Sequence, residues 1–309
     1  MNILVTGGAG FIGSHLCENL LARGDEVFVI DDLSTGGLHN LASILDKITL
    51  FQCRVEDFDF DQLTNMTAVV HLAAQASVPL SISNFYESSK TNILSSLKII
   101  DYCARRKIPM VYASSSAIYG GLSFGDDEVE CSDLLSPYAA DKFALELYAK
   151  VSSVSSKLSS IGLRFFNVYG PRQDPSNPYS GVISIFIKKL LLNEDITING
   201  GMQTRDFVYV ADIASVIARA IDVSLSEQKC DYVNVLTERS VSVDWLADTL
   251  IELTGSSSTK IYNERSIGDP LESNGSGSKL SRILEFDSTS FIKLEQGLVL
   301  TLSDIEREI

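Results

Sequence analysis

Tyr138 and Lys142 stand four residues apart in the segment SPYAADKFALELY, and the serine run Ser114–Ser116 precedes them. Four residues make about one helical turn, so the two side chains share one face of a helix. A free tyrosine, with a pKa of about 10, is a poor base at neutral pH. A nearby ammonium group would stabilise the phenolate and lower this pKa. With a serine hydroxyl bonded to the same substrate oxygen, these groups could move a proton on a substrate hydroxyl.

This spacing alone does not establish a catalytic site, because a tyrosine and a lysine four residues apart fit many ordinary amphipathic helices. The surrounding elements must decide between catalysis and packing. Ser136 and Pro137 directly precede Tyr138. A serine N-cap followed by proline at the first helical position is a typical helix start. We therefore expect a helix that begins here and carries Tyr138 in its first turn.

Composition predicts a soluble, globular protein with a large core. The chain has 309 residues, of which 45% are hydrophobic and 21% charged. Its formal net charge of -15 and the lack of a basic cluster argue against a nucleic-acid partner. No apolar run approaches the roughly 20 residues that span a bilayer, and no signal peptide precedes the first predicted strand. We expect a cytoplasmic protein with neither a nucleic acid nor a membrane as partner.

The cysteines and histidines do not suggest a metal site. Five cysteines are scattered without CxxC spacing, which favours free thiols in a reducing compartment. The three histidines likewise lack the spacing of metal ligands. We therefore expect no bound metal ion.

Short apolar runs alternate with helical patterns through the first half of the chain. Helices are expected at residues 10–22 and 92–105, and strands at Ile3–Val5, Val27–Ile30, Ala68–Leu72 and Met110–Ala113. This alternation indicates βαβ units and hence a parallel sheet. We predict an α/β fold, with a Rossmann-like doubly wound parallel sheet and a smaller mixed α/β C-terminal substrate lobe.

A glycine-rich loop lies between the first predicted strand and the first predicted helix. Gly7, Gly10 and Gly13 allow a tight turn and a close backbone approach to a pyrophosphate at the helix N-terminus. Asp31 follows the second strand, where an acid binds the adenosine ribose hydroxyls and favours NAD over NADP; Asp32 is the second choice. A glycine turn without a ligand is the competing interpretation. It is disfavoured because strand, glycines, helix, strand and acid occur in the required order.

The pattern loosens after residue 166. A proline-rich loop follows in PRQDPSNPYSG, then a helix at Asp212–Asp222 and a strand at Tyr232–Leu236 that could return to the sheet. We expect a Rossmann domain that binds NAD at residues 1–166, with returning segments near 207–236. Residues 167–206 and 237–309 would form the second lobe.

Motifs along essentially the whole chain resemble those of the extended short-chain dehydrogenase/reductase family, and within it those of UDP-sugar 4-epimerases. These motifs are TGGAGFIGSHL, HLAAQASVP, YASSSAIYG, YAADK, LRFFNVYGPRQDP, TRDFVYVADIA and LEQGL. The resemblance implies an isomerase with NAD as cofactor and a UDP-sugar as substrate. The implied reaction is C4 epimerisation of a UDP-hexose through a transient 4-keto sugar.

The resemblance also implies roles for single positions. Ser115 would be the catalytic serine, Tyr138 the base, and Lys142 the residue that binds the nicotinamide ribose and lowers the pKa of Tyr138. The implied cofactor pocket consists of Gly7, Gly10, Phe11, Ile12, Gly13, Asp31, Asp32, Val55, Leu72, Ala73, Ala74, Asn92, Tyr138, Lys142 and Phe165. The implied substrate site consists of Ser77, Ser116, Asn167, Gln173, Gly181, Arg205, Asp269 and Ser273.

Some of these positions bear on the substrate. Asn167 and Arg205 would hold the nucleotide diphosphate, since a guanidinium suits phosphate oxygens; a surface ion pair with Asp206 is the alternative for Arg205. Ser273 aligns with a position that lines the sugar pocket, and Gly181 is equally small. The implied substrates are therefore UDP-N-acetylglucosamine and UDP-N-acetylgalactosamine, with UDP-glucose and UDP-galactose as further candidates.

The chain departs from the family pattern at three places. Arg54 stands where an acid that contacts adenine is usual, which leaves NADP as an alternative. Ser266 stands where an arginine is usual, with Arg265 one residue early. The stretch from Ser273 to Ser276 replaces a segment that usually contains alanine and aspartate, so the diphosphate contact from this loop is open.

Other functions compete with epimerisation. Relatives that dehydrate or decarboxylate nucleotide sugars usually carry an acid just after the catalytic serine or threonine, and Ser116–Ile118 offers none. A dehydrogenase would release NADH. A non-catalytic, NAD-sensing protein is a further alternative, although such proteins often lack the tyrosine or the lysine.

Two predicted helices, at residues 92–105 and 138–151, carry wide apolar stripes. Core packing would explain these stripes. The family resemblance implies instead that the helices pair across a homodimer interface.

Overall fold

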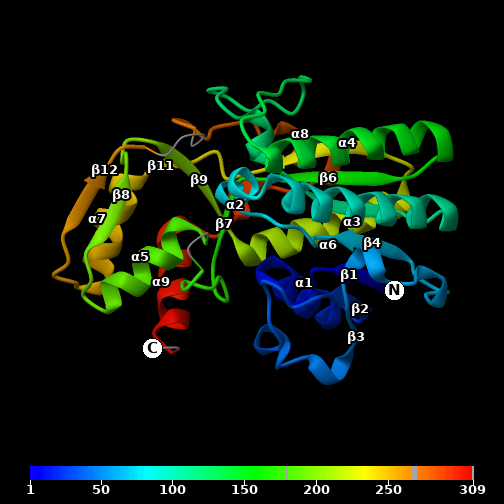
Figure 1. The fold of residues 1–309 in the computed structure, drawn as a ribbon, viewed down its shortest axis with the longest axis horizontal. Helices are drawn as coiled ribbons and strands as arrows, with labels where there is room; N and C mark the ends of the chain where they lie inside the picture. Colours follow the sequence, from blue (N-terminus) through cyan, green and yellow to red (C-terminus); the bar gives the residue numbers. More distant parts are fainter. Residues whose placement is uncertain (178–179, 266–269, 308–309) are drawn as a thin grey trace.

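A seven-stranded parallel sheet forms the larger part of the molecule (Figure 1). The computed structural model describes residues 1–177, 180–265 and 270–307. In spatial order the strands are β10 (Cys230–Val235), β6 (Ser160–Phe165), β5 (Met110–Ser115), β4 (Ala68–His71), β1 (Asn2–Thr6), β2 (Glu26–Asp31) and β3 (Ile48–Gln52). All neighbouring strands pair in parallel. The predicted Rossmann-like sheet is confirmed.

Helices cover both faces of this sheet because its strands carry apolar side chains on both faces. Ile3 and Val5 of β1 belong to one core, which also contains residues of α1 (Phe11–Ala22), α6 (Val210–Ser226) and α8 (Ser278–Leu284). Leu4, which lies between them in the strand, belongs to the opposite core. That core is covered by α3 (Phe85–Arg106) and α4 (Pro137–Ser156) (Figure 1).

A smaller lobe packs α5 (Val182–Leu191), α7 (Val243–Thr254) and α9 (Leu294–Ile305) around a core of its own. Its strands form two small sheets. In one, β8 (Ile196–Asn199) pairs with β12 (Lys260–Asn263). In the other, β9 (Thr204–Tyr209) lies between β7 (Asn167–Tyr169) and β11 (Ser240–Ser242).

The helix that carries Tyr138 begins where the sequence predicts. The Oγ of Ser136 accepts a hydrogen bond from the backbone N–H of Ala139 at 3.2 Å, so Ser136 caps α4. By contrast, α3 begins about two turns before the predicted start at residue 92. The strand predicted near residues 232–236 is β10, and it returns to the edge of the large sheet beside β6.

Two features are absent from the part of the chain that the structure describes, namely a membrane-spanning helix and a cluster of metal ligands. Within residues 1–177, 180–265 and 270–307, no helix is long and apolar enough to cross a membrane. The same residues contain no group of three or more histidine, cysteine, aspartate or glutamate side chains that could hold a metal ion.

Candidate active site

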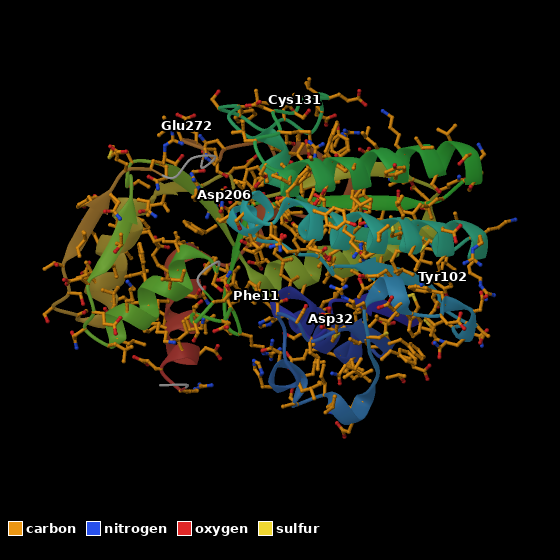
Figure 2. The ribbon with its side chains drawn as sticks, in the orientation of Figure 1. Phe11, Asp32, Tyr102, Cys131, Asp206 and Glu272 are labelled. Atoms are coloured by element: carbon orange, nitrogen blue, oxygen red, sulfur yellow. The ribbon has the colours of Figure 1, made fainter. Side chains whose placement is uncertain are left out.

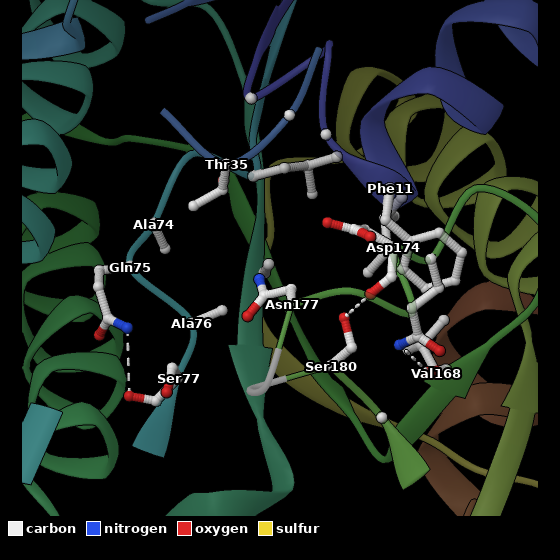
Figure 3. Close-up of a pocket in the computed structure, with 18 of the residues that line it drawn as sticks. Phe11, Thr35, Ala74, Gln75, Ala76, Ser77, Val168, Asp174, Asn177 and Ser180 are labelled. Carbon is white, nitrogen blue, oxygen red and sulfur yellow. Dashed lines mark hydrogen bonds between the residues drawn. The ribbon is translucent and has the colours of Figure 1, made fainter. Parts of the chain in front are cut away.

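A cavity of about 1140 Å³ lies at the carboxyl ends of the sheet strands and continues into the smaller lobe. Gly7 follows β1, Asp31 ends β2 and Ser115 ends β5, and all three line it. Figure 3 shows residues 74–77 on one wall and residues such as Asp174 and Ser180 on the opposite one. Open α/β sheets bind ligands at this edge. The volume lies just above the roughly 300–1,000 Å³ of a typical small-molecule pocket.

The loop between β1 and α1 presents bare backbone to the cavity. Gly7 has a φ of +74°, in the left-handed region that glycine adopts without strain. A Cβ at Gly13 would lie 2.0 Å from the carbonyl oxygen of Gly7. The helix begins at Phe11 without a side-chain cap and without an acid in its first turn. Its first N–H groups therefore suit a phosphate.

Asp31 holds this loop against the end of β2. Its Oδ2 accepts a hydrogen bond from the N–H of Ala9 at 2.9 Å, and its Oδ1 accepts one from Leu33 at 2.9 Å. Burial raises the pKa of Asp31, and the two backbone hydrogen bonds oppose that shift. Asp32 is more exposed, and its Oδ2 lies 3.7 Å from the Nε of Arg54. Both acids line the cavity, where ribose hydroxyls could bind.

Ser115, Tyr138 and Lys142 meet at the carboxyl end of β5 and all line the cavity. Ser115 lies close enough to Tyr138 to lower the pKa of its phenol. The Nζ of Lys142 donates to the carbonyl oxygen of Ala113 at 2.7 Å and lies 5.8 Å from the centroid of the Tyr138 ring. The structure thus brings together the three groups that the sequence singled out.

The electrostatics of these three groups differ from expectation. Burial raises the pKa of Tyr138, Asp141 raises it further, and the hydrogen bond with Ser115 opposes the shift. Burial also lowers the pKa of Lys142 to about 8. The expected fall in the pKa of Tyr138 is therefore wrong for this structure. The reason is that desolvation of the phenol outweighs its partners, while the ammonium group is bonded to a backbone carbonyl.

Most of the other predicted cofactor residues also line the cavity, namely Gly10, Phe11, Ile12, Val55, Leu72, Ala73, Ala74 and Phe165. Asn92 is not among the described lining residues. It is buried, and its Nδ2 donates to Asp141 at 3.0 Å while its Oδ1 accepts from the N–H of Gln75 at 2.8 Å. Asn92 therefore fixes the wall segment around Gln75 from behind.

The predicted substrate residues divide into three groups. Ser77, Asn167, Gln173, Gly181 and Arg205 line the cavity. Among the described residues that line the cavity, Ser116 and Ser273 do not occur. Ser116 begins a 3-10 turn after β5, and the carbonyl oxygen of Ser273 accepts from Ser240 at 3.0 Å. Asp269 and Ser266 lie outside the described residues.

Arg205 and Asp206 are both buried, so the alternative of a surface ion pair does not hold for Arg205. The carboxylate of Asp206 accepts hydrogen bonds from the N–H groups of Thr237 at 2.8 Å and Arg239 at 3.0 Å. Figure 2 shows Asp206 near the junction of the large sheet and the smaller lobe. Asp206 thus holds the turn after β10, while Arg205 faces the cavity.

Several lining residues were not predicted from the sequence. At the far end of the cavity they are Thr197, Ile198, Asn199, Gln203 and Val243, and near the glycine loop they are Ser34, Thr35, Gly36, His39 and Asn40. Gln203 could have been found, because it lies two positions before Arg205, and alternate residues of a strand share a face. The others lie in loops, in β8, in a short 3-10 turn or at the start of α7, and none of these segments carries a recognisable motif.

The fold and this cavity define an α/β protein that binds a dinucleotide beside a tyrosine–lysine–serine group. A family model described as "NAD dependent epimerase/dehydratase family" matches residues 3–235. Over 274 residues the chain is 37% identical to a putative UDP-glucose 4-epimerase of Methanocaldococcus jannaschii, covering 86% of this chain and 87% of the relative. The chain belongs to the NAD dependent epimerase/dehydratase family, which confirms the expected family and its cofactor, NAD.

Solved structures agree over the full chain. A UDP-glucose 4-epimerase of Thermotoga maritima with UDP-glucose has a TM-score of 0.92 and 33% identity, covering 100% of this chain and 99% of that one. A UDP-N-acetylglucosamine 4-epimerase of Methanobrevibacter ruminantium M1, in complex with UDP-N-acetylmuramic acid, has a TM-score of 0.92 and 34% identity with the same coverage. These two proteins are named for different sugars, so the likeness does not distinguish between the substrates.

Gly13→Ala is expected to prevent NAD binding. The added methyl group would lie 2.0 Å from the carbonyl oxygen of Gly7, and a backbone oxygen cannot turn away as a side chain can. The measurement is the NAD content of the purified protein after denaturation. Gly277→Ala is the matched control, because its Cβ would meet only side-chain atoms, of Leu236 at 3.3 Å and of Glu238 at 3.5 Å. An unchanged NAD content in Gly13→Ala would contradict this assignment of the loop.

Proposed function

We propose that the protein catalyses NAD-dependent C4 epimerisation of a UDP-hexose. We further propose that it accepts UDP-N-acetylglucosamine and UDP-N-acetylgalactosamine, with UDP-glucose and UDP-galactose as additional substrates. The observation that carries the proposal is the meeting of Ser115, Tyr138 and Lys142 in one cavity with Arg205 and Asn167. The relatives named as 4-epimerases support the same reaction.

The residues that line the cavity fit NAD. Gly7, Gly10 and Gly13 leave space beside the first turn of α1 for a pyrophosphate, and the carboxylate of Asp31 can accept ribose hydroxyls. Lys142 would bind the nicotinamide ribose. When bound, oxidised NAD supplies a reversible hydride acceptor for a carbon that has no other activation.

The chain's own groups would handle the proton and the position of the sugar. The Oη of Tyr138 takes the proton of the sugar 4-hydroxyl and later returns it, while Ser115 donates a hydrogen bond to the same sugar oxygen. Arg205 and Asn167 hold the diphosphate. A nucleotide held at its diphosphate leaves the sugar free to turn and present its other face.

The surroundings of Ser115 favour epimerisation over the competing reactions. Dehydration requires an acid that protonates the departing hydroxyl, but both neighbours of Ser115 are serines. Ser114 directs its hydroxyl to Glu146 at 2.5 Å, away from the role of a proton donor to substrate. A non-catalytic sensing protein would not need a serine, a tyrosine and a lysine gathered at one strand end.

The deciding experiment is incubation with UDP-glucose and UDP-N-acetylglucosamine in separate reactions without added cofactor. NMR of the products should show the C4 epimer of each, with the N-acetylated sugar used at least as well. A clear preference for UDP-glucose would refute the proposed acceptance of N-acetylated sugars. Accumulation of NADH would identify a dehydrogenase, and loss of water seen by mass spectrometry would identify a dehydratase. A decarboxylase needs a carboxylate, so a third incubation with a UDP-uronic acid tests for loss of carbon dioxide.

The rate is expected to depend on pH through Tyr138. Because burial raises the pKa of this phenol, the phenolate fraction grows about tenfold per pH unit throughout the neutral range. We expect kcat/KM to rise between about pH 6 and pH 8, and to level off as Lys142, with a pKa of about 8, loses its charge. Initial rates at constant ionic strength measure this. A rate that falls between pH 6 and 8 would contradict the role of Tyr138 as base.

We also propose that the protein is a homodimer. The adjacent helices α3 and α4 expose large apolar side chains, among them Tyr86, Leu94, Leu147, Val151 and Val154. Val151→Glu together with Leu147→Glu should give a monomer, because each charge would have to be buried in the interface. Light scattering coupled to gel filtration measures the mass. Val299→Glu on α9 is the control, and a double variant that keeps the wild-type mass would refute this interface.

A reducing compartment, the cytoplasm, suits the cysteines. All five are free thiols, and Cys17 and Cys103 are buried in the cores of the large sheet. We therefore propose that the protein works where thiols remain reduced.

A further inference from the structure

Three consecutive residues at the end of β5 lie beside three residues one helical turn apart on α4. The carbonyl oxygen of Ala113 accepts from Lys142 at 2.7 Å. The hydroxyl of Ser114 donates to the Oε1 of Glu146 at 2.5 Å. Ser115 lies beside Tyr138 and lowers the pKa of its phenol. The strand end is therefore held along α4 by two hydrogen bonds, that of Lys142 to Ala113 in the catalytic group and the outer one of Ser114 to Glu146.

The carboxylate of Glu146 is itself immobilised from the other side. Arg164 on β6 donates from its Nε to Oε1 at 2.8 Å and from its Nη2 to Oε2 at 2.6 Å. The exposed fractions are 1% for Arg164 and 6% for Glu146. A two-bond contact between planar groups fixes orientation as well as distance. Glu146 therefore presents Oε1 to Ser114 in one position.

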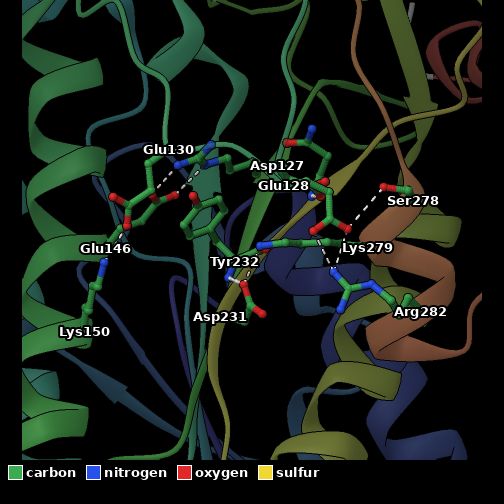
Figure 4. A network of polar contacts seen from close by, with 12 residues as sticks. Asp127, Glu128, Glu130, Glu146, Lys150, Asp231, Tyr232, Ser278, Lys279 and Arg282 are labelled. Atoms are coloured by element: carbon green, nitrogen blue, oxygen red, sulfur yellow. Dashed lines mark hydrogen bonds and ion pairs between the residues drawn. The ribbon is translucent and has the colours of Figure 1, made fainter.

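Arg164 is anchored in turn by the edge of the sheet. Its Nη1 donates to the Oη of Tyr119 at 2.8 Å, and Tyr119 donates to the Oδ1 of Asn234 on β10 at 2.8 Å. The guanidinium carbon also lies 3.8 Å from the centroid of the Tyr232 ring. Figure 4 shows Glu146 on α4 and Tyr232 on β10 facing each other across this network. The chain of contacts runs from β10 through β6 and α4 to β5.

We propose that Glu146 is a positioning residue of the active site, which sets the place of Ser115 relative to Tyr138 and Lys142 by holding Ser114. The inference rests on the proposed epimerase function. Glu146 is not among the described residues that line the cavity, so it acts through Ser114 and not on the substrate. Catalytic geometry tolerates little displacement: a shift of about 1 Å can cost roughly 100-fold in rate. A smaller shift of Ser115 should therefore lower kcat and leave substrate binding unchanged.

The test compares Ser114→Ala, which removes only the hydroxyl, with Ser114→Thr, which retains it. Ser114→Ala should lower kcat by about tenfold, with KM, NAD content and Tm near wild type. Ser114→Thr should recover most of the loss. Glu146→Asp keeps the charge opposite Arg164 but shortens the reach to Ser114, so it should lower kcat in the same way. Ser160→Ala is the matched control, since Ser160 is a buried serine on β6 whose hydroxyl bonds Cys230 instead.

A wild-type kcat in Ser114→Ala, or an equal loss in Ser160→Ala, would overturn the inference. A change confined to KM would do the same, because it would mean a direct contact with substrate. If the wild-type protein converts no UDP-sugar, the proposed function fails, and the positioning role is then decided without substrate. In that case the pKa of Tyr138 is obtained from ultraviolet titrations with Tyr138→Phe as the baseline. Ser114→Ala should raise this pKa, because a displaced Ser115 no longer stabilises the phenolate, and an unchanged value refutes the role.

Discussion

Tyr138→Phe is expected to lower the turnover of UDP-sugar by about 100- to 10,000-fold, the usual contribution of a general base. The variant keeps the ring and loses only the Oη that would take the proton of the sugar 4-hydroxyl. Ser115 and Lys142 remain, but neither can replace the phenolate: a serine hydroxyl is a far weaker acid, and Lys142 is bonded to the carbonyl oxygen of Ala113. Turnover is measured by NMR of the C4 epimers.

The fold and the cofactor should survive this substitution. The substitution removes a single hydroxyl, and one side-chain hydrogen bond contributes only about 1 kcal/mol to the free energy of unfolding. Bound NAD, measured after denaturation, and Tm should therefore stay near wild type. Tyr148→Phe on the same helix is the matched control, because its side chain is exposed. Turnover in Tyr138→Phe within a few fold of that control would refute the assignment of Tyr138 as base.

Arg164→Met is expected to give the largest loss of stability, about 3–5 kcal/mol in the free energy of unfolding. Without the guanidinium, the buried carboxylate of Glu146 would keep only the hydroxyl of Ser114 as a described partner. The hydroxyl of Tyr119 would also lose a donor. Since whole proteins are stable by only about 5–15 kcal/mol, the variant should show a clearly lower midpoint in urea.

Two further variants separate the charge effect from other losses. Arg164→Met combined with Glu146→Leu removes both charges, so it should recover much of the stability that the single change loses. Arg282→Ala breaks the ion pair with Glu128. The side chain of Arg282 is 59% exposed and that of Glu128 is 42% exposed. Loss of that exposed pair should lower the free energy of unfolding far less than loss of the buried pair, because water and salt screen exposed charges. If Arg164→Met and Arg282→Ala lower the free energy of unfolding equally, the buried pair contributes no more to stability than an exposed pair does.

Much of the large sheet could be predicted from local pattern. The apolar runs of β1, β2, β4 and β5 lie between clear helical segments, and the serine–proline pair before Tyr138 marks the start of α4. The strands β3 and β6 were not predicted. The segment of β6, SIGLRF, contains a serine, a glycine and an arginine, yet all six residues are buried. Their burial comes from the neighbouring strands and α4, which no local pattern reports.

The site could be predicted where a motif dictates backbone geometry or supplies reactive groups together. The glycine loop and the tyrosine–lysine pair are of this kind, and both line the cavity. Asn92 matches a motif position as well, but its side chain turns to Asp141 and Gln75. The direction of a side chain on a long helix depends on the neighbours it finds, and these are distant in sequence.

Electrostatic properties were the least predictable part. A tyrosine and a lysine one turn apart suggest a lowered pKa for the phenol. Burial instead raises the pKa of Tyr138 and lowers the pKa of Lys142, so it favours the uncharged form of both groups. The pair of Glu146 and Arg164 was not anticipated for a related reason. A glutamate in a helix and an arginine in a strand are usually solvated, and only the packing of α4 against β5 and β6 buries them together.

The return of β10 to the sheet has a consequence for how the protein is made. Until Val235 has been synthesised, the outer backbone groups of β6 have no strand to pair with, although every residue of β6 is buried in the finished molecule. Translation from Phe165 to Val235 takes roughly 4–14 seconds at about 5–20 residues per second. During this interval the nascent chain carries an open, largely apolar strand edge that could pair with another chain. The large sheet is thus completed only after residues 167–206 of the smaller lobe have been synthesised. A fragment that stops near residue 166 would keep that open edge permanently.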